Sequence, residues 1–253
     1  MIYDGFMFFE NLELLELRLM TLDSVVDRFI IVEMGVTHMN KPKPFHFEEN
    51  KSRFEKYLPK IIHVKSDSLP FHDERQMEVD NRNLIAEGYA GASPDDYIII
   101  SDEDEIPAPD AILEGIHKGY NSFGIRQKLF YYYVNCIAVQ EWDGSMVYRK
   151  RLIPSPQWVR SRRGPCPYLV YGGWHYSFLG SIELIANKLS NFSEQQVNLP
   201  NVNNEENIRH CMETGEDLFH RTEDWAKKRF LTLDELYHPG IKEWINKYPH
   251  NFK

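Results

Sequence analysis

The chain has 253 residues and a formal net charge of −9 at pH 7; 42% of the residues are hydrophobic, 26% charged and 13% aromatic. These values are typical of one globular domain with a large core. The acidic balance argues against a nucleic-acid partner, which would need a basic surface. The many Tyr and Trp residues fit a protein that stacks against flat or sugar-like ligands, and they equally fit an aromatic core.

The cysteines and the N-terminal segment bear on the cellular compartment. Cys136, Cys166 and Cys211 are widely spaced and form no CxxC pair, so we expect neither a disulfide framework nor a zinc site. The first residues include Asp4 and Glu10 and lack the basic region of a signal peptide. No apolar run is long enough to span a membrane. We therefore expect a cytoplasmic protein without a membrane span.

Strand and helix patterns alternate through the first half of the chain. Strands are predicted over residues 6–9, 28–33, 60–64 and 97–101, and helices over residues 12–22 and 74–89. Asn11 is a suitable N-cap for the first of these helices. The alternation predicts parallel βαβ units and hence an α/β domain, with a mostly parallel central sheet flanked by helices. Ligands of such sheets bind at the carboxyl ends of the strands.

The second half of the chain has a different texture. Residues 123–139 are rich in aromatic and β-branched side chains, and residues 155–167, rich in Arg, Pro and Ser, are interpreted as a loop. Residues 181–189 have helical spacing, and short helices with polar loops are predicted from residue 203 onward. Because no repeat and no clear linker interrupts the sequence, we predict a single domain over residues 1–253 with a helical C-terminal tail.

A strongly hydrophobic strand ends in four consecutive acidic residues, Asp102 to Glu105. Clustered carboxylates repel one another, and a hard divalent cation such as Mg²⁺ or Mn²⁺ relieves that repulsion. If the strand continues, its period of two places Asp102 and Asp104 on one side and Glu103 and Glu105 on the other. Such an Asp-x-Asp pair is a candidate site for a metal ion and a diphosphate. The alternative is an acidic, solvated loop.

Several segments together resemble glycosyltransferase family 17, the β-1,4-mannosyl-glycoprotein β-1,4-N-acetylglucosaminyltransferase group. They are residues 4–18, 29–33 with Thr37-His38, 41–44, Arg82-Asn83, 101–107 and 173–180, and they follow the family's order. The resemblance implies a GT-A-like fold, a nucleotide-sugar donor, Mn²⁺ dependence and an inverting reaction. Within the single domain we predict that residues 1–109 bind the nucleotide sugar, that residues 110–200 face the acceptor, and that residues 201–253 form the helical tail.

The resemblance assigns the metal and the donor diphosphate to the acidic segment. Asp102 would meet the ribose or a metal-bound water, and Asp104 would bind the metal, which bridges the two phosphates of the donor. His175 is the candidate third metal ligand, because a neutral imidazole suits Mn²⁺ better than Mg²⁺. The alternative for His175 is a half-buried side chain that is hydrogen-bonded between aromatic rings.

Other residues are candidate contacts for the nucleotide-sugar donor. The resemblance implies that Arg82 and Asn83 touch the donor phosphate or sugar, and Arg suits phosphate through its paired donors. Glu33, at the end of its strand, could hold the nucleoside or could cap a loop. Lys188 and the basic run at 149–151 are possible phosphate or acceptor contacts, although such side chains are often only solvated.

An inverting transfer needs a general base that deprotonates the acceptor hydroxyl as the oxygen attacks the anomeric carbon. Glu141 and Asp143 are the first candidates, because they follow the aromatic segment and flank Trp142, whose ring could stack on a sugar. Glu194 is the second candidate. The alternative for each of them is an ordinary surface carboxylate.

The predicted function is metal-dependent inverting transfer of a sugar to a glycan or glycoprotein acceptor. The favoured donor is UDP-GlcNAc, the cofactor Mn²⁺ or Mg²⁺, and the acceptor sugar a mannose residue. A phosphohydrolase or nucleotidyltransferase is an alternative. However, an aspartyl phosphatase would carry its Asp-x-Asp at the first strand, where this chain has Phe8-Phe9-Glu10, and the Gly-rich basic loop of a nucleotidyltransferase is missing. A non-catalytic carbohydrate-binding protein would have little reason to keep Asp102, Asp104, Arg82 and His175 together.

Overall fold

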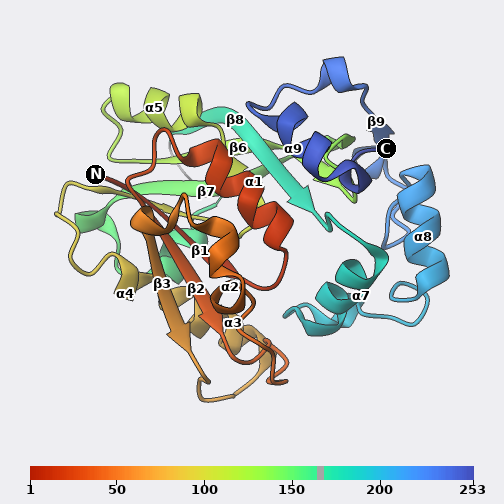
Figure 1. The fold of residues 1–253 in the computed structure, drawn as a ribbon, viewed down its shortest axis with the longest axis horizontal. Helices are drawn as coiled ribbons and strands as arrows, with labels where there is room; N and C mark the ends of the chain where they lie inside the picture. Colours follow the sequence, from red (N-terminus) through yellow and green to blue (C-terminus); the bar gives the residue numbers. More distant parts are fainter. Residues whose placement is uncertain (164–167) are drawn as a thin grey trace.

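In the computed structural model, which describes residues 1–163 and 168–253, the chain forms one nine-stranded sheet with helices on both sides (Figure 1). The strands are β1 (Ile2–Phe8), β2 (Arg28–Met34), β3 (Ile61–Ser66), β4 (Tyr97–Ile100), β5 (Glu105–Pro107), β6 (Ser122–Tyr131), β7 (Cys136–Arg149), β8 (Leu169–Ser177) and β9 (Lys228–Phe230). The α-helices are α1 (Leu12–Leu22), α2 (His46–Glu49), α3 (Glu74–Asn83), α4 (Ile85–Gly88), α5 (Pro109–His117), α6 (Pro156–Arg160), α7 (Ile182–Asn191), α8 (Glu205–Thr214) and α9 (Ile241–Lys247). The predicted α/β fold with a central sheet and flanking helices is confirmed.

The N-terminal half of the sheet is parallel, as predicted. Strands β3, β2, β1 and β4 lie side by side in that order, and every neighbouring pair among them is parallel. At the centre of β1, Gly5 pairs with Ile30 of β2 on one side and with Ile100 of β4 on the other. The carboxyl ends of these strands meet at one edge of the sheet. The loops that follow β1, β2 and β4 therefore gather there.

The second half of the chain makes the sheet mixed. Strand β7 is antiparallel to both β4 and β6, β6 is parallel to β8, and β8 is antiparallel to β5. The aromatic segment at 123–139 is two strands, separated by a turn in which Tyr132 has a φ of 64°. Among the turn residues 132–135, only Asn135 is of a type that favours turns. The sequence therefore contains little indication of a turn at this point.

Two further segments differ from the sequence-based prediction. The helix predicted over 74–89 is interrupted at Leu84, so that α3 and α4 are separate. The segment predicted as a loop contains α6, whose N-cap Ser155 accepts a hydrogen bond from the backbone N–H of Trp158 at 3.2 Å. The rest of that segment includes Cys166 and lies partly outside the described residues. Cys136 and Cys211 are buried, free cysteines.

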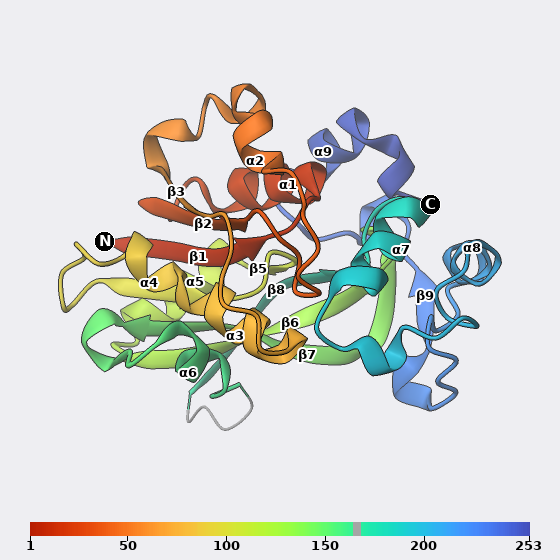
Figure 2. The same ribbon diagram turned by 90° about the horizontal axis from the view of Figure 1, so that it is seen from below.

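The helices cover both faces of the sheet (Figure 2). Leucines of α1 pack with Phe6 and Phe29 on one face. Ile85 of α4 packs with Ile30 on the opposite face. Ile30 points to this face because successive side chains of a strand alternate, and Phe29 before it points to the other. Gly88 at the end of α4 permits this close approach, because a Cβ at that position would lie 2.2 Å from Cγ2 of Ile30.

The C-terminal tail is helical but also contributes a strand. Strand β9 pairs antiparallel with β7, beyond the parallel half of the sheet (Figure 1). The His238 ring stacks on Trp174 with ring centroids 3.8 Å apart, and its two nitrogens contact the hydroxyls of Tyr176 and Thr21, each at 2.7 Å. The tail is thus anchored to β8 and α1. Across residues 1–163 and 168–253, no helix has the length and apolarity needed to cross a membrane.

Candidate active site

The acidic segment forms a tight loop at the carboxyl end of β4. Strand β4 ends at Ile100, and the backbone N–H of Glu105 donates to the carbonyl of Asp102 at 3.1 Å, which closes a turn. The carboxylate of Glu105 in return accepts the N–H of Asp102 at 3.0 Å. The prediction that a continuing strand puts Asp102 and Asp104 on one side is therefore wrong, because these two hydrogen bonds turn the chain at Glu103 and Asp104.

The loop nevertheless lies at the predicted edge of the sheet. The backbone N–H of Phe9, just after β1, donates to the carboxylate of Glu103 at 2.9 Å. The acidic loop, defined as residues 101–105, therefore adjoins the end of β1. This is the edge at which ligands of parallel α/β sheets bind.

Asp104 lies between a lysine and a histidine from the second half of the chain. Its carboxylate accepts a hydrogen bond from Nζ of Lys188 at 2.7 Å, and its Oδ1 lies 3.4 Å from Nε2 of His175. Burial by itself would raise the pKa of Asp104, but Lys188 and His175 outweigh it and hold that pKa well below its usual range. Asp104 therefore stays ionised in a nearly buried site.

Asp102 is held by two arginines. Arg82 on α3 donates to its carboxylate at 3.2 Å, and Arg160 on α6 forms a second ion pair with it. Burial by itself would raise the pKa of Asp102, but Arg160 and Arg82 together lower it. About a third of the Asp102 side chain, 32%, is exposed, so this carboxylate can be reached by a ligand from solvent.

Glu105 joins the acidic loop to the second half of the molecule. It is fully buried and accepts hydrogen bonds from Arg160 at 2.6 and 2.9 Å, and from the indole N–H of Trp142 at 2.6 Å. Arg163 lies 3.4 Å from the same carboxylate, with its guanidinium over the Trp142 ring. The pairing of Glu105 with Arg160 was not predicted, because nothing in the sequence indicates that residues so far apart are paired.

The predicted metal ligands converge only in part. Asp104 and His175 are neighbours, whereas Asp102 faces the two arginines, and the described residues include no group of three or more His, Cys, Asp or Glu side chains arranged to hold a metal ion. The donor set of two carboxylates and an imidazole suits Mn²⁺. Nδ1 of His175 is buried without a hydrogen-bond partner. The residues therefore fit a divalent cation chemically, while basic side chains neutralise the two aspartates in this structure.

The predicted donor contacts lie close to the acidic loop. Arg82 is buried and donates to Glu78 at 2.6 Å as well as to Asp102 and Gln157. The side-chain oxygen of Asn83 accepts the backbone N–H of Gln157 at 3.1 Å, which joins α3 to α6. Arg82 thus has a place beside the candidate diphosphate site, whereas Asn83 holds two helices together.

Glu33 caps a loop and does not face a possible nucleoside site. Its side chain is fully buried, and it accepts the backbone N–H of Phe47 at 2.9 Å. Nε2 of His63 lies 3.1 Å and Nζ of Lys43 lies 3.7 Å from the same carboxylate. A carboxylate that is enclosed by these partners has no atom available for a nucleoside, so the geometry argues against the donor-binding alternative.

Glu141 and Asp143 do not face the acidic loop, contrary to their predicted role as general base. Both lie within β7, where they pair across the sheet: Glu141 with Lys128 at 2.7 Å, and Asp143 with Arg126 at 2.6 and 3.0 Å. Trp142 between them points to Glu105, and side chains that alternate along a strand point to opposite faces. The two carboxylates therefore lie on the other side of the sheet from the candidate site. Glu194, the second candidate, is exposed just after α7.

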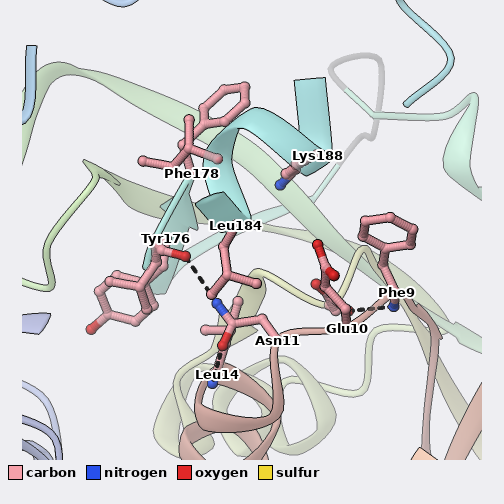
Figure 3. A pocket seen from close by; sticks show the side chains of 11 residues that line it. Phe9, Glu10, Asn11, Leu14, Tyr176, Phe178, Leu184 and Lys188 are labelled. Carbon is pink, nitrogen blue, oxygen red and sulfur yellow. Dashed lines mark hydrogen bonds between the residues drawn. The ribbon is translucent and has the colours of Figure 1, made fainter. Parts of the chain in front are cut away.

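Figure 3 shows a small cavity, which adjoins the acidic loop because Glu103 is one of its lining residues. Its volume is about 20 Å³, and Phe9, Glu10, Glu103, Phe178 and Lys188 are among the residues that line it. Such a cavity holds about one water molecule, so a sugar ring does not fit there in this arrangement. Burial raises the pKa of Glu103 to about 7.

The sequence model of glycosyltransferase family 17 matches residues 1–229 of this chain. The chain belongs to this family, and the predicted resemblance is confirmed. The chain is 33% identical over 116 residues to the human β-1,4-mannosyl-glycoprotein 4-β-N-acetylglucosaminyltransferase, an alignment that covers 40% of this chain and 21% of the human protein. The rat protein of the same name is also 33% identical over 116 residues, with 40% and 20% covered. The chain thus matches about a fifth of the length of these relatives.

Two solved structures are distantly similar to this chain. The structure of 4-diphosphocytidyl-2C-methyl-D-erythritol synthase has a TM-score of 0.40 and 14% identity, and the match covers 68% of this chain and 88% of that one. The structure of residues 1–349 of TarS from S. aureus has a TM-score of 0.42 and 11% identity, with 98% and 79% covered.

Proposed function

We propose that this chain transfers GlcNAc from UDP-GlcNAc to a glycan acceptor with inversion, and that the transfer depends on Mn²⁺ or Mg²⁺. The observation that carries the proposal is the placement of Asp102 and Asp104 at the carboxyl edge of the parallel strands, beside His175, Lys188 and Arg82. Carboxylates, an imidazole and cations at this edge are the groups that a metal diphosphate requires.

Each of these side chains has a proposed role. Asp102, Asp104 and His175 would hold the divalent cation, which supplies positive charge to the diphosphate as UDP departs. Lys188 and Arg160, which pair with the aspartates in the structure, would then be free to bind phosphate oxygens, together with Arg82. Asp102 is the most exposed of the three proposed ligands and is therefore the side chain that a ribose hydroxyl could reach.

The acceptor is proposed from the names of the relatives. The human and rat proteins are named as N-acetylglucosaminyltransferases that act on β-1,4-mannosyl-glycoprotein. By analogy we propose a glycan acceptor with a terminal or branched mannose. The cytoplasmic location expected from the sequence and the absence of a nucleic-acid partner stay predictions.

The test is a screen for release of UDP from UDP-GlcNAc, UDP-glucose and UDP-galactose, with a mannose-containing glycan present or absent, in Mn²⁺ and in EDTA. Release from UDP-GlcNAc that needs both the glycan and Mn²⁺ supports the proposal. Release of UMP or of inorganic phosphate would instead favour a nucleotidyltransferase or a phosphohydrolase. No reaction with any of the three sugar nucleotides would contradict the proposal.

A further inference from the structure

A fully buried arginine lies directly beneath the acidic loop. Arg18 projects from α1, and neither it nor its partner Asp4 on β1 has any exposed side-chain surface. Nε and Nη2 of Arg18 donate to the two carboxylate oxygens of Asp4 at 2.8 and 2.6 Å. This paired geometry fixes the plane and the direction of the guanidinium.

The remaining donors of Arg18 all go to the acidic loop. Nη1 donates to the backbone carbonyls of Asp102 at 3.0 Å, Glu103 at 3.2 Å and Glu105 at 2.8 Å. Nη2 donates to the hydroxyl of Ser101 at 2.6 Å. One side chain therefore contacts four of the five residues of this loop, and three of their carbonyls point inward to a single nitrogen.

The free energy of folding alone does not explain why this ion pair is buried. Removing two charges from water costs several kcal/mol per ion, and well-packed apolar side chains of similar volume often stabilise a core as well or better. What an apolar pair could not do is hold three carbonyls at one point. The Asp104 carbonyl, between them in the chain, accepts the backbone N–H of Tyr176 on β8 at 2.8 Å. With the loop backbone held in this way, the side chain of Asp102 extends toward Arg160 and that of Asp104 toward His175 and Lys188.

We propose that Arg18, oriented by Asp4, is the positioning residue of the active site: it fixes the backbone of the acidic loop and so holds Asp102 and Asp104 at the carboxyl edge of the sheet. This inference rests on the proposed function for the role of the two aspartates, although the hold on the loop itself does not. Arg18 touches neither donor nor metal, and it acts only through the loop.

Lysine is the informative replacement. It keeps the charge opposite Asp4, but an ammonium is a single point with three donors and cannot span the carboxylate and the carbonyls together. The matched control is Leu19→Ala, because Leu19 is a fully buried residue of the same helix that packs in the core. Leu19→Ala lowers stability without removing a hydrogen bond to the acidic loop.

Two measurements distinguish positioning from general stability. The first is hydrogen exchange of the metal-free protein in the segment 101–107, which contains the backbone N–H groups of Asp102 and Glu105. The second is calorimetry of UDP binding in Mn²⁺. We expect Arg18→Lys to speed exchange in this segment and to weaken UDP binding by about 10- to 100-fold, the usual cost of losing a supporting contact. Leu19→Ala should do neither at a temperature where both variants are folded.

The outcomes separate the inference from the proposed function. Equal loop exchange and equal UDP affinity in Arg18→Lys and Leu19→Ala would overturn the inference. If the wild type itself fails to bind UDP in Mn²⁺, the proposed function fails, while faster exchange confined to the loop of Arg18→Lys still supports the hold on the loop. Should Arg18→Lys not fold, Ser101→Ala removes one of the contacts and should speed loop exchange, and normal exchange in it would overturn the inference.

Discussion

At the scale of single residues, basic side chains neutralise the carboxylates that are proposed to bind metal. Lys188 pairs with Asp104, whose side chain is nearly buried, and it would compete there with the proposed divalent cation. The same lysine is one of the side chains proposed to bind the phosphates of the donor. One side chain is thus expected to oppose binding of the metal alone and to favour binding of the metal with the nucleotide.

Lys188→Met should therefore change two affinities in opposite directions. Mn²⁺ alone should bind more tightly, by roughly three- to tenfold, because a competing charge is removed, while UDP in saturating Mn²⁺ should bind less tightly by a similar factor. Calorimetry measures both affinities. Lys128→Met, which breaks only the ion pair with Glu141, is the control. Weaker binding of Mn²⁺ to Lys188→Met would contradict this account.

Glu141→Gln and Asp143→Asn should keep turnover within about twofold of wild type, because both carboxylates lie on the far face of the sheet. Removal of a general base typically costs about 10²- to 10⁴-fold in rate. Steady-state rates of sugar transfer by the two variants and the wild type test this expectation. A loss of that size in either variant, with UDP affinity unchanged, would restore the general-base assignment that the geometry argues against.

At the scale of elements, periodicity predicted the parallel half well and the acidic loop poorly. The helix at 12–22 with its N-cap Asn11 was predicted as found, since apolar spacing and capping are local properties. The turn at 102–105 combines a local hydrogen bond, from the N–H of Asp102 to the Glu105 carboxylate, with tertiary contacts to Arg18. No local pattern in the sequence reveals the contacts to Arg18. For Trp142 the signal was present, because an inward Trp on a strand implies that both neighbours point outward.

The close contact of α4 with β2 gives a prediction at this scale. Gly88→Ala should lower the free energy of unfolding by about 1–3 kcal/mol, because the new Cβ overlaps Ile30 in a packed core. Urea unfolding measures the change. The double variant Gly88→Ala with Ile30→Val should recover part of the loss relative to Ile30→Val alone. Strictly additive effects would show that the two positions do not share this contact.

At the scale of the whole molecule, the C-terminal tail is joined to the sheet through a neutral, buried histidine. Burial lowers the pKa of His238 to about 3, while in the unfolded chain an ordinary His has a pKa of about 6.5. At a pH below about 6.5, the pKa of His238 in the unfolded chain, the unfolded chain binds a proton that the folded protein does not. The stability associated with a neutral His238 is therefore complete above pH of about 6.5 and is lost as the pH falls toward 3.

Unfolding by urea between pH 7 and 5 tests this linkage. The wild type should lose up to about 1.4 kcal/mol per pH unit from this one group below pH of about 6.5. His238→Gln should be less stable at pH 7, because the stacking on Trp174 is lost, but its stability should fall less steeply with decreasing pH. Parallel pH profiles for the two proteins would mean that His238 is not kept neutral by the fold.

The proposed function requires above all that the acidic loop bind a nucleotide diphosphate through a divalent cation. The most direct measurement is calorimetry of UDP binding to wild type and to Asp104→Asn, each in Mn²⁺ and in EDTA, with melting temperatures recorded as a check on folding. We predict binding by wild type in Mn²⁺, a loss of at least about tenfold in EDTA, and a similar loss in Asp104→Asn even with Mn²⁺. Equal UDP affinity with and without the cation, or normal Mn²⁺-dependent affinity in Asp104→Asn, would contradict the proposed function.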